Sequence, residues 1–587
     1  MSFTYPDQES PSLRDVDLTV DEGEWCLVAG RTGSGKSTLL RAVNGLVPRF
    51  SGGVLRGSVT VAGRSTSEVK PRDLAETVGF VGQDPAAGFV TETVEEELAY
   101  APEQLGLAPT VMRTRVEEIL DLLGLDGLRD RPLRSLSGGQ QQRVAIGSVL
   151  TAHPRVLVLD EPTSALDPTA AEDVLGAVAR LVHDIGVTVL IAEHRIERVV
   201  HFADTVLELR DDGTAGKGAP GDVLAGLAVA PPIVVLAEAL QWVPPPLSVR
   251  AARRRLAADP RRGVIDRVGG DDRAHAAEPD ARPVVATLDS VSVRRGDVGA
   301  VHDVSLRVHR GEIVALMGRN GSGKSSLLWA VQGSLPRVTG TVRVADGTDR
   351  ESRATTSTVS SAHGDVRWWG RLLGGRPAAG RVGSVEGQAG HGACTWGVDP
   401  AALPAPAARH LVGMVPQTPS DLLYHETVGE ELDTAGGGDA GAAARARSLL
   451  ASLLSVTIPD RSHPRDLSEG QRLALVLALQ LSAEPALLLL DEPTRGLDVP
   501  GKADLARWCR SEGRAAIIAT HDVEFVADVA DRVVVLSHGE LIADGPVREV
   551  LGSTPMLSTQ VAKVTAPTGL LTVREVCDAL AALIGTR

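Results

Sequence analysis

Two segments of the chain combine glycines, a lysine and a serine at a spacing that suits phosphate binding. Residues 30–37 read GRTGSGKS and residues 318–325 read GRNGSGKS, so both fit the pattern G-x-x-x-x-G-K-S. Glycines let backbone N–H groups approach phosphate oxygens closely, the lysine reaches the outer phosphates, and the serine hydroxyl helps to hold Mg²⁺. The sequence therefore predicts two nucleotide sites in one chain.

The two phosphate loops differ only at Thr32 and Asn320, and a further hydroxyl residue, Thr38 or Ser326, follows each loop. We expect the residues of both cradles to contact the phosphates of ATP, with Ser37 and Ser325 also reaching Mg²⁺. In the first half the cradle residues are Gly30, Gly33, Ser34, Gly35, Lys36, Ser37 and Thr38. In the second half they are Gly318, Gly321, Ser322, Gly323, Lys324, Ser325 and Ser326.

Each phosphate loop is followed, further along the chain, by an apolar run that ends in two acids. Residues 156–161 read VLVLDE and residues 487–492 read LLLLDE. Continuous apolar runs are typical of strands buried on both faces of a parallel sheet. An aspartate at the end of such a strand can orient the metal, and the adjacent glutamate can polarise the attacking water. We therefore expect Asp160 and Asp491 beside Mg²⁺, and Glu161 and Glu492 as catalytic bases.

The elements that must position these residues recur in α/β order. A short β-like run precedes each phosphate loop, at residues 24–29 and 312–317, and helical periodicity follows the loop. Further apolar runs at residues 188–192 and 515–519 have the same character. This order predicts an α/β fold in which each half has a mainly parallel sheet as its core.

The two halves are a repeat, and the spacing of equivalent residues shows where they differ. The lysines of the two phosphate loops are 288 positions apart, whereas Gln83 and Gln417 are 334 apart. The difference of 46 residues places an insertion in the second half, at about 345–409. Its richness in Gly, Ala, Arg, Ser and Thr predicts a loosely packed surface loop. The alternative is that Trp368 and Trp369 within it dock a partner.

A second repeat marks the end of each half. The sequence LSVR at 247–250 returns as LTVR at 571–574, so each half carries a short C-terminal extension. These extensions could join the two halves near the edge formed by residues 164–167 and 495–498, or simply cover apolar surface. The expected units are a first ATPase domain at 1–230 with its extension at 231–259, a linker at 260–283, a second ATPase domain at 284–554, and its extension at 555–587.

Composition excludes several classes of protein. The 587 residues are 43% apolar and carry a net charge of −15, so a broad basic surface for nucleic acid is not expected. The four cysteines form no C-x-x-C pair, which argues against a zinc ribbon or a disulfide framework and favours a cytosolic protein. No apolar run approaches the ~20 residues of a membrane helix. Met1 opens almost directly into motif-bearing sequence, which leaves no room for a signal peptide.

Two further motifs identify a family. The sequence LSGGQ at 136–140 and its counterpart LSEGQ at 467–471 each place a serine 23 positions before the metal-side aspartate. These segments resemble the signature motif of ABC-type ATPases. Gln83 and Gln417 match the Q-loop of that family, and His194 and His521 match its switch histidine. The sequences SALD at 164–167 and RGLD at 495–498 match its D-loop. The resemblance covers nearly all of both halves.

This resemblance implies two ATPase domains that sandwich two ATP molecules head to tail. Each domain would add an antiparallel β subdomain and a helical signature subdomain to its parallel core. Each signature serine begins a helix whose positive end suits a γ-phosphate held by the other half. Site one would combine Lys36, Ser37, Gln83, Asp160, Glu161 and His194 with Ser468 and Gly470. Site two would combine Lys324, Ser325, Gln417, Asp491, Glu492 and His521 with Ser137, Gly138 and Gly139. The implied Mg²⁺ ligands are Ser37, Gln83 and Asp160, and Ser325, Gln417 and Asp491.

The two halves depart from the family pattern in different ways. Glu469 replaces a signature glycine and would bring a carboxylate near the phosphates of site one. The family also places an aromatic residue beneath adenine, and Tyr5 fits that position in the first half. Aligning Leu13 with Val301 puts Val293 there in the second half, where stacking would be lost. We therefore expect unequal hydrolysis at the two sites.

The segments after the two Q-loop glutamines point to a type of transporter. Gln83 is followed by TVEEEL at 93–98, and Gln417 by TVGEEL at 427–432. This pattern resembles the fused, duplicated ATPase of energy-coupling factor (ECF) importers, which take up vitamins and transition-metal ions. That resemblance implies a peripheral protein at the cytoplasmic face of the membrane. Its partners would be a transmembrane coupling subunit and a small substrate-binding membrane protein. The acids after Thr93 could instead form a solvated helix face.

Two other machines share parts of this pattern. The tandem ATPase of sugar importers is duplicated in the same way, but its second half usually has a more degenerate catalytic motif than Asp491-Glu492. A soluble tandem ABC translation factor would carry a long charged linker and a basic surface, which an acidic chain with a short linker does not match. In ECF systems a separate membrane protein selects the transported substrate, so the resemblance assigns that choice to a partner of this chain.

Overall fold

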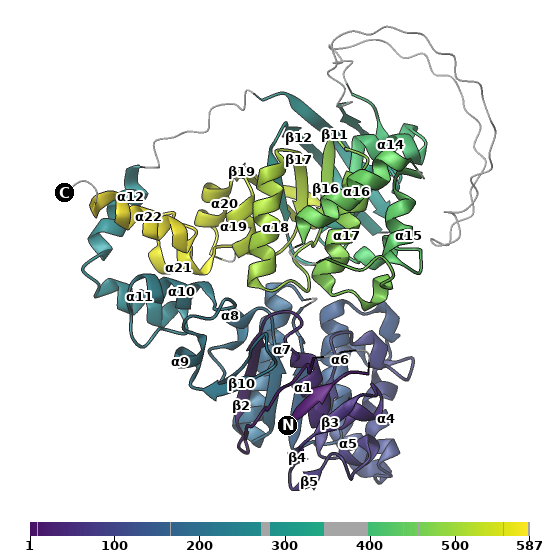
Figure 1. Cartoon of the computed structure of the whole chain (residues 1–587), viewed down its shortest axis with the longest axis vertical. Helices are drawn as coiled ribbons and strands as arrows, with labels where there is room; N and C mark the ends of the chain where they lie inside the picture. Colours follow the sequence, from purple (N-terminus) through teal and green to yellow (C-terminus); the bar gives the residue numbers. More distant parts are fainter. Residues whose placement is uncertain are drawn as a thin grey trace.

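The computed structural model shows two α/β lobes, one above the other, joined along one side by a group of helices (Figure 1). Lobe one comprises residues 1–230 and lobe two comprises residues 284–554. The structure describes residues 1–271, 282–345 and 397–584, apart from Asp7, Glu9, Ala165, Asp297, Gly438, Ser455, Val456 and Met556.

The core of lobe one is a six-stranded sheet in the order β10-β9-β2-β8-β7-β6. Five of its strands are parallel, and only β10 runs antiparallel to its neighbour β9. The central strands are apolar along their whole length because helices cover both faces of the sheet. The strands are β2 (Trp25–Gly30), β6 (Val78–Val81), β7 (Val156–Asp160), β8 (Thr188–Ala192), β9 (Thr205–Leu209) and β10 (Ala215–Gly218).

Lobe two repeats this sheet strand for strand. Its order is β15-β16-β17-β13-β18-β19, again with five parallel strands and one antiparallel edge strand, β19. Its strands are β13 (Ile313–Met317), β15 (Val412–Val415), β16 (Leu487–Asp491), β17 (Ala515–Ala519), β18 (Arg532–Ser537) and β19 (Glu540–Pro546). The two sheets confirm the predicted α/β class and the predicted repeat.

Each lobe also has a smaller antiparallel part. In lobe two it is a three-stranded sheet of β11 (Val284–Arg295), β12 (Val298–His309) and β14 (Arg337–Val344). In lobe one it consists of two short pairs. These are β1 (Ser2–Thr4) with β3 (Val54–Arg56), and β4 (Thr60–Val61) with β5 (Arg64–Ser65).

Helices in matching positions pack around both cores. Those that follow the phosphate loops are α1 (Lys36–Val43) and α13 (Lys324–Gln332), and the signature helices are α6 (Gly138–Leu150) and α17 (Glu469–Leu481). Beside the signature helices lie α4 (Val94–Gln104), α5 (Pro109–Leu123), α15 (Val428–Asp433) and α16 (Ala440–Leu453). The remaining helices of lobe one are α2 (Leu46–Arg49), α3 (Pro71–Leu74), α7 (Pro168–Arg180), α8 (Ile196–Val199) and α9 (Pro220–Leu224). Those of lobe two are α14 (Ala405–Leu411), α18 (Val499–Glu512), α19 (Val523–Val529) and α20 (Val547–Ser553).

The two C-terminal extensions pack against one another and form what we call the helical bridge. It contains α10 (Pro232–Ala239), α11 (Val249–Ala257), α12 (Arg262–Asp271), α21 (Gln560–Thr565) and α22 (Val573–Ile584). Figure 1 shows these helices on the left, where they connect the lobes. They share one apolar cluster with members from both extensions, so the extensions join the two halves by packing on one another. Its buried members are Ile233, Leu236, Ala237, Leu240, Trp242, Ala252, Leu256, Ile265, Val561, Val564, Leu570 and Val576.

The structure corrects two expected boundaries. Residues 262–271, expected within a linker, form α12, which packs on α22 with Ile265 fully buried. The expected insertion at 345–409 also ends sooner. Its last residues form a short 3-10 helix, Pro400–Ala402, and most of α14, whose Ala408 is buried. Residues 346–396, including Trp368 and Trp369, lie outside the described part of the chain.

The apolar stretch that comes nearest to a membrane helix in the sequence folds as α10 inside the helical bridge. Among the residues that the structure describes, no helix has both the length and the apolar composition needed to cross a membrane.

Replacement of Trp242 by alanine should destabilise the helical bridge. The Trp242 side chain is 5% exposed, and its indole N–H donates to Asp259 at 2.7 Å. Loss of such a side chain costs about 3–5 kcal/mol of unfolding free energy. Denaturant unfolding, followed by far-UV circular dichroism so that the loss of a tryptophan does not affect the signal, measures the change. Val243→Ala is the control, because Val243 is 82% exposed, and an equal loss in that variant would contradict the packing described.

Candidate active sites

The predicted site residues of each lobe meet at the carboxyl ends of its parallel strands. In lobe one, the phosphate loop leaves β2, Gln83 follows β6, Asp160 ends β7, and His194 follows β8. Strands β6, β7, β8 and β2 are neighbours in this order, so the four segments converge on one edge of the sheet. The same convergence occurs in lobe two along β15, β16, β17 and β13.

Each phosphate loop wraps around the ammonium group of its own lysine. Lys36 donates to the carbonyls of Gly30 and Arg31 at 2.9 and 2.8 Å. Lys324 makes the same two contacts with Gly318 and Arg319, at 2.8 and 3.1 Å. Burial lowers the pKa of both lysines. An anion held by the loop would offset that loss of solvation, which is the chemistry expected of a phosphate cradle.

Glycine is required at the start of both helices that follow the loops. Gly35 and Gly323 have φ of 97° and 101°, in the left-handed region. A Cβ on Gly35 would lie 2.7 Å from the carbonyl oxygen of Ser12, and one on Gly323 would overlap that of Ala300. The turn into α1 and α13 therefore depends on glycine for both conformation and space.

Buried polar atoms around each loop fit Mg²⁺ and nucleotide. Within the described residues, the hydroxyls of Ser34 and Ser322 and one oxygen each of Asp160 and Asp491 are buried without a hydrogen-bond partner. Burial raises the pKa of Asp160, and it raises that of Asp491 to about 6. Ser37 donates to Asp160 at 3.2 Å, so a hydroxyl and a carboxylate are already adjacent. A bound Mg²⁺ would supply the positive charge that these buried carboxylates lack.

In site one, the predicted base is contacted by the switch histidine and by the Q-loop glutamine. Glu161 lies 2.8 Å from Nε2 of His194 and accepts from the amide of Gln83 at 3.1 Å. Burial opposes ionisation of Glu161, but the hydrogen bond and charge of His194 outweigh it and hold its pKa below the ordinary value. The carboxylate is thus in the form that can accept a proton from water.

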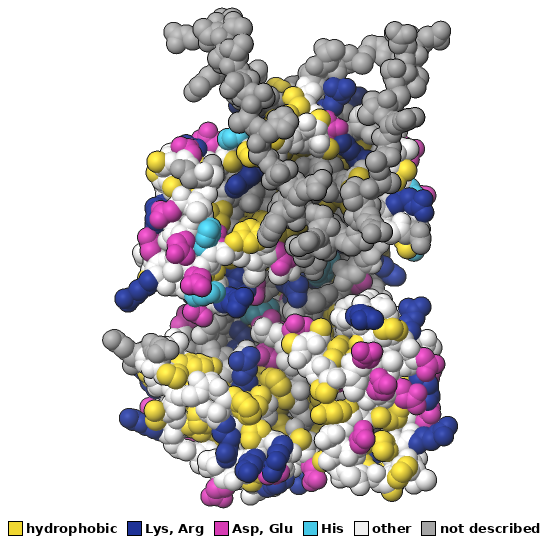
Figure 2. All heavy atoms as spheres, turned by 90° about the vertical axis from the view of Figure 1, so that its right-hand side faces the viewer, with side chains coloured by type: hydrophobic (Ala, Val, Ile, Leu, Met, Phe, Trp, Pro, Cys, Tyr) yellow, Lys and Arg dark blue, Asp and Glu magenta, His cyan; other side chains and the backbone are white. Residues whose placement is uncertain are grey.

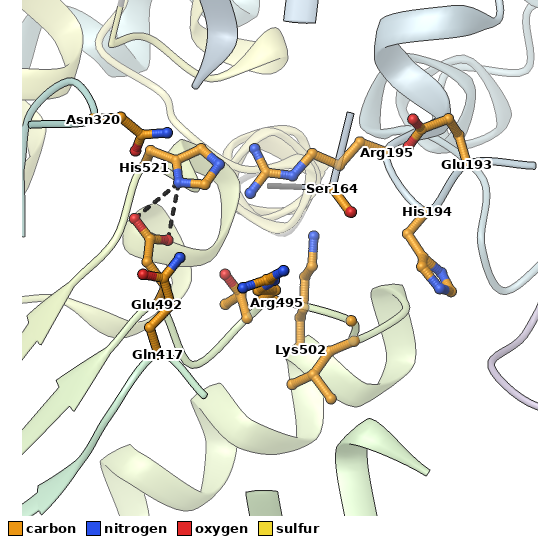
Figure 3. Close-up of a pocket in the computed structure, with 13 residues that line it drawn as sticks. Ser164, Glu193, His194, Arg195, Asn320, Gln417, Glu492, Arg495, Lys502 and His521 are labelled. Atoms are coloured by element: carbon orange, nitrogen blue, oxygen red, sulfur yellow. Dashed lines mark hydrogen bonds and ion pairs between the residues drawn. The ribbon is translucent and has the colours of Figure 1, made fainter. Parts of the chain in front are cut away.

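Site two has the same base and histidine with different supporting contacts. Glu492 lies 2.9 Å from Nδ1 of His521 and accepts from the Thr520 hydroxyl at 3.3 Å (Figure 3). Gln417 lies in the same cavity. Both glutamates have φ near +50°, a strained backbone for a residue with a side chain, so both strand ends hold the base in a constrained orientation.

The signature serines begin α6 and α17 as predicted, and the structure gives a local reason for their motif. The Ser137 hydroxyl accepts from the N–H of Gln140, whose side chain accepts in return from the N–H of Ser137. Ser468 and Gln471 form the same reciprocal pair. Serine and glutamine at this spacing form a capping box, which leaves the intervening N–H groups of the first turn free for an anion.

The sites of the two lobes are connected by the aspartates that end the D-loop motifs, to which the sequence analysis assigned no contact. Asp498 caps α18 and also accepts from the N–H of Thr32, in the phosphate loop of lobe one, at 2.8 Å. Asp167 caps α7 and accepts from the N–H of Asn320, in the other phosphate loop, at 3.4 Å. Both belong to the D-loop motifs, so the motif was the available signal.

Glu469, the unusual signature residue, is engaged within its own lobe. Its carboxylate lies 3.0 Å from the guanidinium of Arg472 on the same helix, and its methylene groups lie against Gly496. This ion pair offsets the negative charge of the Glu469 carboxylate, which the sequence analysis expected near the phosphates of site one.

The register of the strands corrects the comparison of Tyr5 with Val293. Leu13 and Val301 do occupy equivalent places beside the phosphate loops. However, Leu13 pairs with Phe3, whereas Val301 pairs with Val293, and Val293 is fully buried. The counterpart of Val293 is therefore Phe3. Two positions further on, Tyr5 donates to or accepts from Thr38 at 3.0 Å, and the corresponding residue of lobe two is the exposed Arg295. Site two still has no aromatic side chain at this position.

The fold and the two sites define an ATPase with two P-loop nucleotide-binding lobes in one chain. The family model described as ABC transporter matches residues 13–164, 301–371 and 381–495. An ABC transporter ATP-binding protein of Streptomyces avermitilis is 49% identical over 99% of both chains. One from Methanosarcina acetivorans is 31% identical over 94% of this chain and 86% of its own. The chain belongs to the ABC transporter family of ATP-binding proteins, and its lobes are ATPase domains.

A solved structure supports the tandem arrangement at the level of fold. The structure titled RNase-L Inhibitor covers 94% of this chain and 91% of its own, with a TM-score of 0.53. At 19% sequence identity, this likeness shows that the two chains share a fold and carries no statement about function.

Replacement of Tyr5 by alanine should weaken nucleotide binding at site one. Stacking of a base on an aromatic ring contributes about 1–3 kcal/mol, which corresponds to roughly 5- to 150-fold in affinity. Titration with a fluorescent ATP analogue measures this loss. Tyr5→Phe keeps the ring and removes only the contact with Thr38, so it should bind nearly as well as the wild type. A loss in Tyr5→Phe as large as that in Tyr5→Ala would refute stacking.

Removal of the two catalytic bases should affect ATP hydrolysis unequally. A positioned general base contributes about 10²- to 10⁴-fold at its own site. The supporting contacts of Glu161 and Glu492 differ, and so do the residues at the position expected beneath adenine. The steady-state rates of Glu161→Gln and Glu492→Gln should therefore differ from one another. Phosphate release at saturating ATP provides the comparison, and equal losses in the two variants would argue against two unlike sites.

Proposed function

We propose that this protein is the ATP-hydrolysing subunit of an importer of the ECF type. In this function it lies at the cytoplasmic face of the membrane, binds a transmembrane coupling subunit, and powers uptake of a vitamin or metal ion selected by a separate membrane protein. Support comes from the family, from the paired motifs after the two Q-loops, and above all from how the structure holds the loops that contain them.

In lobe one, a buried glutamate fixes the loop that follows Gln83. The Glu97 side chain is 3% exposed. Its carboxylate accepts from the N–H groups of Val90 and Thr91 at 3.0 and 2.9 Å, and from the Thr91 hydroxyl at 2.8 Å. Glu97 is therefore not part of a solvated helix face. It holds the backbone of a loop in place, and the side chain of Val90 in that loop is 62% exposed.

Lobe two uses the same device. The Glu431 side chain is 4% exposed, and its carboxylate accepts from the N–H groups of Tyr424 and His425. The Tyr424 ring is 60% exposed. Each lobe thus presents one ordered loop with an exposed apolar or aromatic side chain, shortly after its Q-loop glutamine. Contiguous apolar patches on a surface are typical of protein-binding sites, and we infer that each of these side chains belongs to such a patch.

Both loops precede helices that lie on the same side of the molecule. Helices α4 and α15 are on the right of the two lobes in Figure 1. Figure 2 faces that side and shows hydrophobic side chains gathered on lobe one, the lower lobe. Because Gln83 contacts the catalytic base, movement of a subunit docked on this loop would reach Glu161 through a few residues of chain. A membrane subunit with two apolar cytoplasmic helices fits this arrangement.

Purification from native membranes tests this proposal. The tagged full-length protein should bring down integral membrane proteins in detergent, in fixed ratio to the chain. Recovery with ribosomes would instead support the soluble translation factor, and recovery with a pair of large transmembrane subunits and a sugar-binding protein would support the sugar importer.

Substitution of Val90 or Tyr424 by aspartate should release the membrane subunits. A charge placed in an apolar interface cannot be desolvated cheaply, so the amount of co-purified membrane protein should fall at least about tenfold. Quantitative immunoblotting of the purified complex measures the loss. Ile542→Asp is the matched control, since Ile542 is also 62% exposed but lies on strand β19. Equal release in the control would contradict a specific docking role.

A further inference from the structure

The residue that follows the switch histidine differs between the lobes. In lobe one it is Arg195, and in lobe two it is Asp522. These two equivalent positions contact one another across the lobe interface, with a guanidinium nitrogen of Arg195 3.4 Å from the Asp522 carboxylate. Lys502 of lobe two lies 2.8 Å from the same carboxylate. Asp522 is 5% exposed, so its charge is neutralised in a largely buried place by one cation from each lobe.

This contact brings Arg195 into the active site of the opposite lobe. Arg195 lines one cavity together with the base and histidine of site two, and with Asn320 of the second phosphate loop. Figure 3 shows the Arg195 side chain extending toward His521, while His194 lies at the other end of the view. Burial lowers the pKa of His521, and the nearby charge of Arg195 lowers it further, which agrees with this proximity.

Asp522 also connects Arg195 to the backbone that carries His521. One Asp522 oxygen accepts from the N–H of Phe525 at 3.3 Å and so caps α19. The N–H of Asp522 donates to the Thr520 hydroxyl at 3.1 Å, and that hydroxyl in turn donates to Glu492. The segment 520–522 is therefore held at the helix end, at the base and, through Arg195, by the other lobe.

Among the described residues, no equivalent ion pair forms at site one. The position that corresponds to Arg195 is occupied in lobe two by an aspartate, which is already paired with Lys502 and Arg195. In site one, Glu161 is contacted within its own lobe by His194 and Gln83, and the charge of Arg495 from lobe two helps to lower its pKa without a hydrogen bond between them among the described contacts.

We propose that Arg195 of lobe one is a positioning residue for hydrolysis at site two. It holds Asp522, and through it the His521–Glu492 pair, in place when the lobes are closed, and it has no such role at site one. Hydrolysis at site two then depends on lobe closure through an ion pair that has no counterpart in the described part of site one. This inference rests on the ATPase activity of the family and not on the proposed membrane partners.

Two single-site backgrounds test the proposal in the full-length chain. Glu161→Gln leaves site two as the intact site, and Glu492→Gln leaves site one. Misplacement of catalytic groups by about an ångström costs up to roughly 10²-fold, so Arg195→Ala in the Glu161→Gln background should lower kcat about 10- to 100-fold. The KM for ATP should change little, because Arg195 contacts no phosphate-loop backbone in the described contacts. In the Glu492→Gln background, kcat should change less than about twofold.

Two further variants separate positioning from folding. Arg195→Lys keeps a cation that can reach Asp522 and should recover most of the lost rate. Arg155→Ala removes an ion pair of 2.9 Å with Glu22 inside lobe one, and it should leave both backgrounds unchanged. Equal losses for Arg195→Ala in the two backgrounds, or no loss in either, would overturn the proposal.

A second measurement assigns the effect to a site without relying on turnover in either background. After hydrolysis of 8-azido-ATP, vanadate takes the place of the released phosphate and traps 8-azido-ADP, which illumination then attaches covalently to the lobe that holds it. Cleavage at a protease site introduced within residues 272–281 separates the two labelled lobes on a denaturing gel. In otherwise wild-type protein, Arg195→Ala should reduce the labelling of lobe two about tenfold or more. The labelling of lobe one should stay unchanged. Reduced labelling of both lobes to the same extent, or of lobe one alone, would refute the proposal.

Discussion

The arrangement of the whole molecule depends on two aspartates that each serve both lobes. Asp498 and Asp167 cap a helix of their own lobe with one oxygen and hold the phosphate loop of the other lobe with the second. A cap is part of local folding, so each aspartate is already oriented by its own helix when the other lobe packs against it. The phosphate loop of each lobe is therefore held in part by a side chain of the other lobe.

The helical bridge holds the two lobes close enough for these contacts to form. Its apolar cluster takes side chains from the extensions of both halves, which keeps the lobes at high effective concentration whether or not nucleotide joins them. Fusion has a second consequence. Two identical lobes would place the same residue opposite itself at the position after the switch histidine, either two arginines or two aspartates. Unlike lobes in one chain allow Arg195 to meet Asp522, so the interface can be asymmetric and charge-paired.

Much of the local structure was predictable from short segments. The turn from β2 into α1 requires glycine at 35 for conformation and space, and serine with glutamine three positions later specifies the start of α6. The strand register was not predictable in the same way. The two hairpins beside the phosphate loops differ by two residues in length, so Phe3 and not Tyr5 corresponds to Val293. Helix α12 was also missed, because its charged sequence becomes helical by packing on α22.

Taken by itself, the sequence determined that this chain has two phosphate loops, two acid pairs at strand ends and two capped signature helices. Each of these is encoded by residues close together in the chain, where spacing and backbone conformation are sufficient. The tertiary structure alone decided which side chains cross between the lobes. Arg195 and Asp522 are separated by 327 positions, and although each follows a switch histidine, nothing local indicates that the two meet. Only the packing of one folded lobe against the other brings that guanidinium beside His521, since contacts between distant segments depend on the shape of both surfaces.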